Sequence, residues 1–333
     1  MPGKTDATTL HTSSKPMCSL VAQSNGEDPV GSVPTWERCL VMELAPPWEH
    51  DVAESKHFPA LAREALKRAE KSGPPTRLQC ILPDPQHSRP GHARVMLFRR
   101  TAGPLAFHSR AEYVVPDAEL GALAAALLNG PSAAQGYERY RVDGSRMRDI
   151  LVCTHGSRDA CCATFGFPVY QALRGMVARF QGTVRVWRTS HTGGHRFAPT
   201  VIDLPDGRYW GHLDEDLIET VLGRKGPVET LRMHYRGWTG MSGGPLQAAE
   251  REAFLHEGWS WIGYLKVGKL RDGVSTMGQY IVQIDFASPD GAVKGAFEAV
   301  VETLWSVPVP QCMSPGTKGE SPQYRVADLQ RLV

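Results

Sequence analysis

Two short segments rich in cysteine and histidine constrain this chain more than any other feature of its sequence. Residues 153–162 read Cys-Thr-His-Gly-Ser-Arg-Asp-Ala-Cys-Cys, and residues 191–195 read His-Thr-Gly-Gly-His. Thiolates and imidazoles are ligands for zinc or for an iron–sulfur cluster, whereas a structural disulfide needs no paired histidines. The pattern predicts two cysteines and two histidines around one metal centre, so the fold must bring these two segments together.

Composition limits the remaining possibilities. The chain has 333 residues, 41% of them hydrophobic, which suggests about two domains. A net charge of +2 gives no strong field, so neither nucleic acid nor a membrane surface is favoured as a partner. No stretch approaches the roughly 20 apolar residues of a membrane span. An odd number of cysteines, 7, with three of them crowded together, suits a reducing compartment, and we expect a cytoplasmic protein.

Local patterns predict an α/β fold in which one order of strands and helices is used twice. The first unit is expected to have a helix near 61–69, a helix over 117–128, and strands at 39–44, 77–82, 93–98 and 111–115. The second is expected to have helices at 168–180 and 216–222, and strands at 149–153, 183–187, 200–204 and 208–211. The cysteine and histidine segments then follow two strands whose ends lie at one edge of a sheet, where sites in open α/β sheets occur.

The two segments also carry a family resemblance. Residues 153–159 with Cys162, and residues 191–201, which read His-Thr-Gly-Gly-His-Arg-Phe-Ala-Pro-Thr-Val, resemble the sucrase/ferredoxin-like family. Residues 46–48, 205–211 and 235–238 also resemble members of this family, so the resemblance covers roughly residues 36 to 300. It implies a thioredoxin-like fold and an electron-transfer protein that carries a [2Fe–2S] cluster, held by two cysteines and two histidines.

The resemblance also implies the ligands of the cluster, which are Cys153, Cys162, His191 and His195. Because the second cysteine is doubled, Cys161 stays open as an alternative to Cys162, and His155 and His212 are reserve candidates. Arg158 and Arg196 flank the ligands and are candidates to hydrogen-bond the sulfides or to stabilise the reduced state. Two thiolates and two neutral imidazoles leave the oxidised centre uncharged, so we expect a potential of about −150 to +300 mV rather than about −400 mV.

The resemblance and the local patterns together predict the organisation of the chain. The fold is expected to be α/β, with two tandem thioredoxin-like lobes and a C-terminal α+β extension that holds a strand at 279–286 and a helix at 292–305. The expected boundaries are a disordered tail (1–34), a lobe without a cluster (35–145), a ferredoxin lobe (146–224), the extension (225–310) and a flexible tail (311–333).

Two other functions compete with electron transfer. A structural zinc site of the Cys2His2 type fits the spacing of His191 and His195 but not the nine-residue step between the cysteines. A serine hydrolase is suggested by Ser242 in Gly-Met-Ser-Gly-Gly. However, the only later histidine, His256, precedes Asp272, Asp285 and Asp290, and Glu250 and Glu252 are too close to it in sequence to serve as the acid. We therefore expect an electron carrier rather than a stand-alone enzyme, with an unidentified protein as its redox donor or acceptor.

Overall fold

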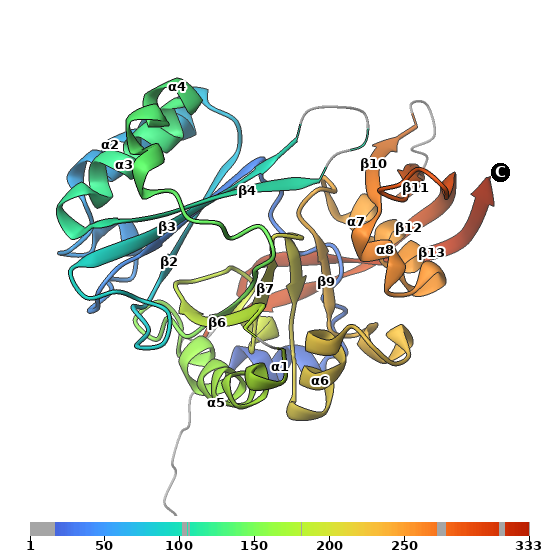
Figure 1. Ribbon diagram of the computed structural model, residues 1–333. Helices are drawn as coiled ribbons and strands as arrows, with labels where there is room; N and C mark the ends of the chain where they lie inside the picture. Colours follow the sequence, from blue (N-terminus) through green and yellow to red (C-terminus); the bar gives the residue numbers. More distant parts are fainter. Residues whose placement is uncertain are drawn as a thin grey trace, which may run out of the picture.

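The chain forms a mixed α/β structure, which confirms the α/β part of the predicted fold class (Figure 1). The computed structural model describes residues 17–101, 105, 107–180, 182–271, 278–312 and 317–332. One sheet has nine strands in the order β4-β3-β1-β2-β6-β5-β7-β8-β9, and a second has four in the order β10-β11-β12-β13. Within these residues, no helix has both the length and the apolar character that crossing a membrane requires.

The strands of the larger sheet are β1 (Arg38–Glu43), β2 (Thr76–Ile81), β3 (His92–Arg100), β4 (His108–Pro116), β5 (Arg148–Cys153), β6 (Val184–Thr189), β7 (Val201–Leu204), β8 (Arg208–Trp210) and β9 (Tyr235–Trp238). The α-helices are α1 (Cys18–Ser24), α2 (Ala60–Ser72), α3 (Leu120–Asn129), α4 (Pro131–Ala134), α5 (Ala160–Met176), α6 (Glu215–Gly223), α7 (Gly244–Glu257) and α8 (Ser260–Gly263). Short 3-10 helices are η1 (Val52–Glu54), η2 (Asp117–Glu119), η3 (Gln135–Tyr140), η4 (Val177–Phe180), η5 (His195–Phe197) and η6 (Val228–Leu231).

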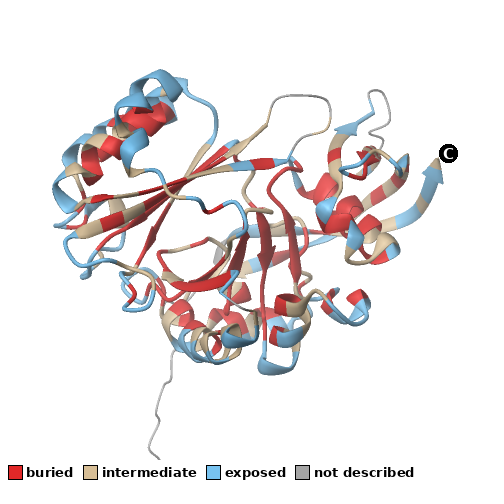
Figure 2. Cartoon of the chain, in the orientation of Figure 1, coloured by how far each residue is buried: buried red, intermediate tan, exposed pale blue. Residues whose placement is uncertain are grey.

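The larger sheet consists of two halves that pack against each other. The pair Ile81 and Thr189 is where β2 of the first half meets β6 of the second. Because side chains alternate along a strand, one face of each half packs on helices, α2 and α3 in the first half and α5, α6 and α7 in the second. The opposite faces form a shared core, to which Phe98 and Trp187 belong. Figure 2 shows these buried residues running along the strands of both halves.

A buried ion network also joins the two halves. Arg185 of β6 donates to Asp149 of β5 at 2.8 Å and to Glu112 of β4 at 2.8 Å, and Arg110 reaches Asp149 at 2.7 Å. Burial raises the pKa of Asp149, but Arg185 and Arg110 outweigh it and hold that pKa below its ordinary value. Removing one partner of such a buried pair typically costs about 3–5 kcal/mol. The network therefore fixes how the halves lie on each other.

The C-terminal part differs from the sequence expectation. The predicted helix at 292–305 is wrong, because residues from 294 onward belong to strand β12 (Lys294–Pro310). Phe297, Ala299 and Val301 are buried at alternate positions, which is the period of a strand. Strands β10 (Leu265–Leu270), β11 (Gln279–Ala287) and β13 (Thr317–Leu332) complete this sheet, against which α7 packs.

Both segments that we expected to lack structure contain ordered elements. Helix α1 lies within the tail expected at 1–34, and β13 lies within the tail expected at 311–333. Residues 1–16, 313–316 and 333 fall outside the described part of the chain. Strand β13 is ordered because it pairs along β12, and α1 because Cys18 packs beside Cys161 and Ala198.

Helix α5 begins eight residues earlier than predicted. We expected it to start at Pro168, but it starts at Ala160, because Asp159 caps it by accepting the N–H of Cys161 at 2.9 Å. Pro168 lies inside the helix. Cys161 and Cys162 are therefore in the first helical turn rather than in a loop.

Candidate metal centre

The parallel pairing of β5 and β6 brings the cysteine and histidine segments to the same edge of the sheet, as expected. Cys153 is the last residue of β5 and pairs with Thr189, the last residue of β6. His191 follows two residues later, and Cys162 lies in the first turn of α5, after the loop that leaves β5. One strand end, one helix start and one loop thus meet at this edge.

Three of the four predicted ligands converge there. The ligand atoms of Cys153, Cys162 and His191 all lie within 4.8 Å of one another, and the Cys162 sulfur is 3.7 Å from His191 Nδ1. Both cysteines are fully buried, whereas His191 is half-buried. Burial raises the pKa of Cys153, but hydrogen bonds from Cys162 and His191 outweigh it and bring that pKa well below its ordinary value. The hydrogen bond with Cys153 raises the pKa of Cys162, so the pair favours one thiolate, the form that binds metal, at Cys153.

The fourth predicted ligand, His195, lies beside this group. Its ring centroid is 6.2 Å from that of His191, and its side chain is 22% exposed. The Nδ1 atom of His195 is 2.9 Å from an oxygen of Asp159 and 2.9 Å from the Cys18 sulfur. Because Nδ1 is engaged, Nε2 is the ring nitrogen left for a metal.

The two adjacent cysteines of α5 belong to different groups. Cys162 is with Cys153 and His191, whereas the Cys161 sulfur lies 3.2 Å from that of Cys18 and 3.0 Å from that of Cys312. Successive residues of a helix point about 100° apart, so neighbouring side chains face different partners. This separation favours Cys162 over Cys161 at the first group.

The histidine loop is held by an arginine that the sequence did not single out. Gly193 and Gly194 have φ values of 85° and 68°, a region that favours glycine. Fully buried Arg236 donates to the Gly193 carbonyl at 3.0 Å, and a Cβ on Gly194 would lie 2.3 Å from its Nη2. Burial lowers the pKa of Arg236 to about 10, so it stays charged at neutral pH. In the sequence, Arg236 was notable only because residues 235–238 are part of the family resemblance.

Two further contacts fix the backbone of His191. Arg77 of β2 donates to its carbonyl at 2.7 Å, and its own N–H donates to His155 Nδ1 at 3.2 Å. The hydrogen of His155 is therefore on Nε2, from which it reaches the Glu49 carbonyl at 2.9 Å. Burial lowers the pKa of His155, which favours this neutral form. His155, a reserve ligand candidate, thus acts as a support for the loop.

Three other candidates contact residues outside the predicted ligand set. Arg158 donates to the carbonyl of His50 at 3.2 Å, and Arg196 pairs with Glu27 at 2.7 Å. His212 Nδ1 is 2.8 Å from Gln23 Nε2. The two arginines therefore tie the metal-centre loops to neighbouring segments.

A groove of about 370 Å³ leads to the site from the surface. His191 lines it, together with Arg77 and His155 and the charged side chains of Arg63, Arg158 and Asp51. The Cys153 and Cys162 sulfurs lie behind His191 in the interior. The imidazole of His191 is therefore the part of the group that another molecule can approach.

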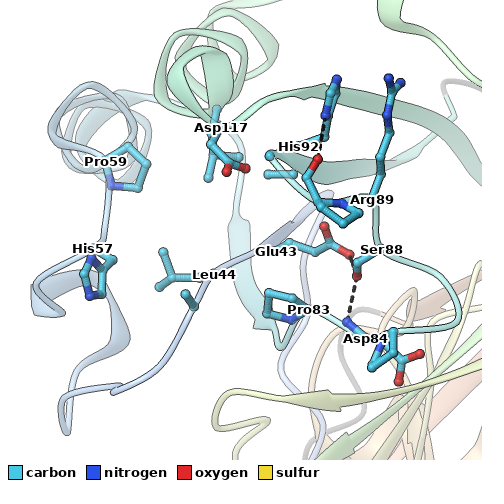
Figure 3. A pocket seen from close by; sticks show the side chains of 16 residues that line it. Glu43, Leu44, His57, Pro59, Pro83, Asp84, Ser88, Arg89, His92 and Asp117 are labelled. Atoms are coloured by element: carbon cyan, nitrogen blue, oxygen red, sulfur yellow. Dashed lines mark hydrogen bonds between the residues drawn. The ribbon is translucent and has the colours of Figure 1, made fainter.

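The corresponding end of the first half-sheet holds a cavity of about 670 Å³ (Figure 3). Glu43, at the end of β1, and Asp84, which follows β2, line it, and the described lining residues include no cysteine. Glu43 accepts from the Ser88 hydroxyl and, at 2.8 Å, from the Arg94 N–H. This cavity differs chemically from the thiol-lined end of the second half.

Ser242 lies exposed in the turn between β9 and α7, the strand-to-helix context expected from its motif. No hydrogen bond joins its hydroxyl to a histidine or an acid among the residues described. The arrangement offers no base to activate this serine.

Comparisons with known proteins agree with the motifs. The sucrase/ferredoxin-like family model matches residues 29–237. No curated protein matches the chain. A thioredoxin-like [2Fe–2S] ferredoxin from Aquifex aeolicus aligns with 19% identity and a TM-score of 0.24, covering 28% of this chain and 97% of its own. A cysteine-to-serine variant of that ferredoxin aligns with 21% identity and a TM-score of 0.22, covering 26% of this chain and 96% of its own. TM-scores this low do not establish a shared fold.

Proposed function

This chain belongs to the sucrase/ferredoxin-like family, and on that premise we propose that it is an electron-transfer protein carrying a [2Fe–2S] cluster. The observation that carries the proposal is the convergence of Cys153, Cys162 and His191 within 4.8 Å. We assign these three residues and His195 as the ligands. The two segments that supply them are those in which the family resemblance is strongest.

The donor set fits such a cluster. The buried sulfurs of Cys153 and Cys162 would provide two thiolates, and His191 and His195 would provide two neutral imidazoles. When bound, the cluster would take up and release one electron. Two thiolates in place of four remove two negative charges, which supports a potential nearer to the Rieske range than to that of four-cysteine ferredoxins.

The surrounding residues have separate tasks in this proposal. Arg236 and Arg77 hold the histidine loop through its carbonyl groups, and His155 holds the N–H of His191. Asp159 orients the ring of His195 by accepting from Nδ1, as carboxylates commonly do for metal-bound histidines. The interior position of the two cysteines excludes water from the sulfur side.

We place the exchange of electrons at the groove lined by His191. A ligand imidazole at the surface shortens the path to another molecule, and the groove carries charges of both signs for docking. The partner is then a redox protein, and the chain acts as a carrier in the cytoplasm rather than as a stand-alone enzyme. The tandem thioredoxin-like lobes at 35–145 and 146–224 belong to the same proposal and are supported by the parallel pairs β1–β2 and β5–β6.

Iron and acid-labile sulfide, measured on anaerobically purified full-length protein, test the proposal. We expect about two of each per chain. Cys153→Ser and Cys162→Ser should lose both, whereas Cys39→Ser, which changes a fully buried cysteine on β1, should retain them. A colourless protein with zinc and no sulfide, whose zinc is lost in Cys153→Ser, would instead establish the structural zinc site.

A further inference from the structure

A second group of sulfur atoms lies behind the predicted metal centre. The sulfurs of Cys18, Cys161 and Cys312 and a carboxylate oxygen of Asp159 all lie within 4.8 Å of one another. Cys161 is central, at 3.2 Å from the Cys18 sulfur and 3.0 Å from that of Cys312. Cys18 and Cys161 are fully buried, Asp159 is 8% exposed, and Cys312 is half-buried.

The three cysteines come from segments far apart in the sequence. Cys18 begins helix α1, Cys161 is in the first turn of α5, and Cys312 follows strand β12. In Figure 1, α1 lies beside α5, and Cys18 contacts Cys161. The contacts join residues separated by 143 and 151 positions. None of the three is among the four ligands assigned to the cluster.

The number and kind of these donors favour a metal ion over a disulfide or packed thiols. A disulfide joins two sulfurs and leaves the third without a role. Packed thiols need no acid, yet the carboxylate of Asp159, which already accepts from the Cys161 N–H and lies against His195, also reaches the three sulfurs. Three thiolates and one carboxylate, by contrast, complete the four positions of a closed tetrahedral site.

We propose that Cys18, Cys161, Cys312 and Asp159 form a second metal site, which binds Zn²⁺. Thiolate-rich tetrahedral sites select zinc, and zinc does not change its oxidation state. Binding would replace the three thiol protons with one Zn²⁺ and release them to solvent. The N-terminus of α5 favours the negative charge that remains.

The site would attach two segments that are distant in sequence to the metal-centre helix. Helix α1 and the segment after β12 would both be bound to the first turn of α5, one residue before Cys162. Asp159 also contacts His195, so the zinc would brace the helix start and the histidine together. This inference does not depend on the cluster, because the two groups share no ligand.

Zinc, iron and sulfide, measured together on full-length variants, test the proposal. We expect about one zinc per chain in the wild type. Cys161→Ser and Cys312→Ser should lose this zinc and keep iron and sulfide, and the control Cys39→Ser should keep all three. Cys153→Ser should do the reverse and keep only zinc. Absence of zinc from the wild type, or its loss in Cys153→Ser but not in Cys161→Ser, overturns the proposal.

Cobalt binding keeps the test decisive if a variant folds poorly. In the Cys153→Ser background, which removes the absorption of a cluster, Co²⁺ should give sulfur-to-metal charge-transfer absorption. Adding Cys312→Ser should abolish this absorption, and adding Cys39→Ser should leave it. Mass spectrometry after alkylation without reductant should find Cys18, Cys161 and Cys312 as thiols, and a disulfide between any two of them contradicts the zinc site.

Discussion

The Nδ1 atom of His195 lies 2.9 Å from a carboxylate oxygen of Asp159, the residue that caps helix α5. One carboxyl group therefore sets both the start of the cysteine helix and the ring of a histidine 36 residues further along the chain. Carboxylates that orient metal-bound histidines are commonly almost as important as the ligands. This pair couples the two segments that the proposed cluster needs.

Asp159→Asn should weaken cluster binding by about 10–100-fold, the usual effect of losing such a partner. It should also raise the midpoint potential, because a negative charge beside a ligand is removed. Asparagine remains a good helix cap, so α5 should persist. Iron retention against a chelator and spectroelectrochemistry measure both effects. Asp214→Asn, at the exposed cap of α6, is the matched control and should change neither.

Gly166→Ala should reduce iron content and destabilise the protein. A Cβ at Gly166 would lie 2.0 Å from the carbonyl oxygen of Cys153, so the end of β5 and α5 must separate. Overpacking of this kind typically costs about 1–3 kcal/mol. Gly175→Ala, in the same helix with open space around its Cβ, should instead stabilise the fold by about 0.4–1 kcal/mol. Urea unfolding gives the free energy of unfolding of both variants, and equal changes in the two would contradict the packing argument.

Gly194→Ala should impair the histidine loop more than Gly193→Ala. Both residues have positive φ, so each substitution costs roughly 1–2 kcal/mol of backbone strain. Only a Cβ at Gly194 would clash with Arg236, which is held by Ser32 and the Gly193 carbonyl and cannot move away freely. Iron content per chain measures the difference. A Gly193→Ala variant that loses as much iron as Gly194→Ala would mean that Arg236 does not shape the loop.

Stability should fall in mild acid partly because of His108. Burial, with Arg100 of β3 and Lys266 of β10 nearby, lowers its pKa to about 3, against about 6.5 in the unfolded chain. The unfolded state thus binds more protons between these two pKa values. The contribution of neutral His108 to the free energy of unfolding is therefore complete above pH 6.5 and is lost as pH falls towards 3. From pH 7.5 to 5 the loss is about 2 kcal/mol.

His108→Phe should remove that part of the pH dependence. The ring packs 4.6 Å from that of Trp36, and phenylalanine can occupy the same place without titrating. Urea unfolding at both pH values gives the change in unfolding free energy for each protein. The wild type should lose about 2 kcal/mol more than the variant, and identical losses would show that His108 is protonated in the folded state.

The sequence predicted the elements that carry the site better than their boundaries. The strands at 149–153 and 183–187 occur as β5 and β6, and their parallel pairing brings Cys153 and His191 together. The start of α5 was missed because Pro168 is typical of a first turn, whereas the cap at Asp159 starts the helix earlier. Similarly, Ala292 to Trp305 were assigned to a helix although the burial of Phe297 and Val301 follows strand spacing.

Clusters whose residues lie far apart in the sequence could not be predicted from local patterns. Cys18 and Cys312 lie more than 140 positions from Cys161, and no spacing rule connects them. Arg236 lies 43 positions from Gly193, and only the two glycines indicated that something approaches the loop closely. Such contacts depend on how the two half-sheets and the C-terminal strands pack, which local patterns do not encode.

Pulsed electron paramagnetic resonance of the reduced, anaerobically purified protein tests the central claim most directly. A [2Fe–2S] cluster with ligands His191 and His195 should give a signal that carries nitrogen couplings from both imidazoles. Labelling with ¹⁵N-histidine should change those couplings, and His195→Cys should remove one of them while the cluster is kept. A reduced protein without a signal, or a signal without histidine couplings, would contradict a cluster bound by two cysteines and two histidines.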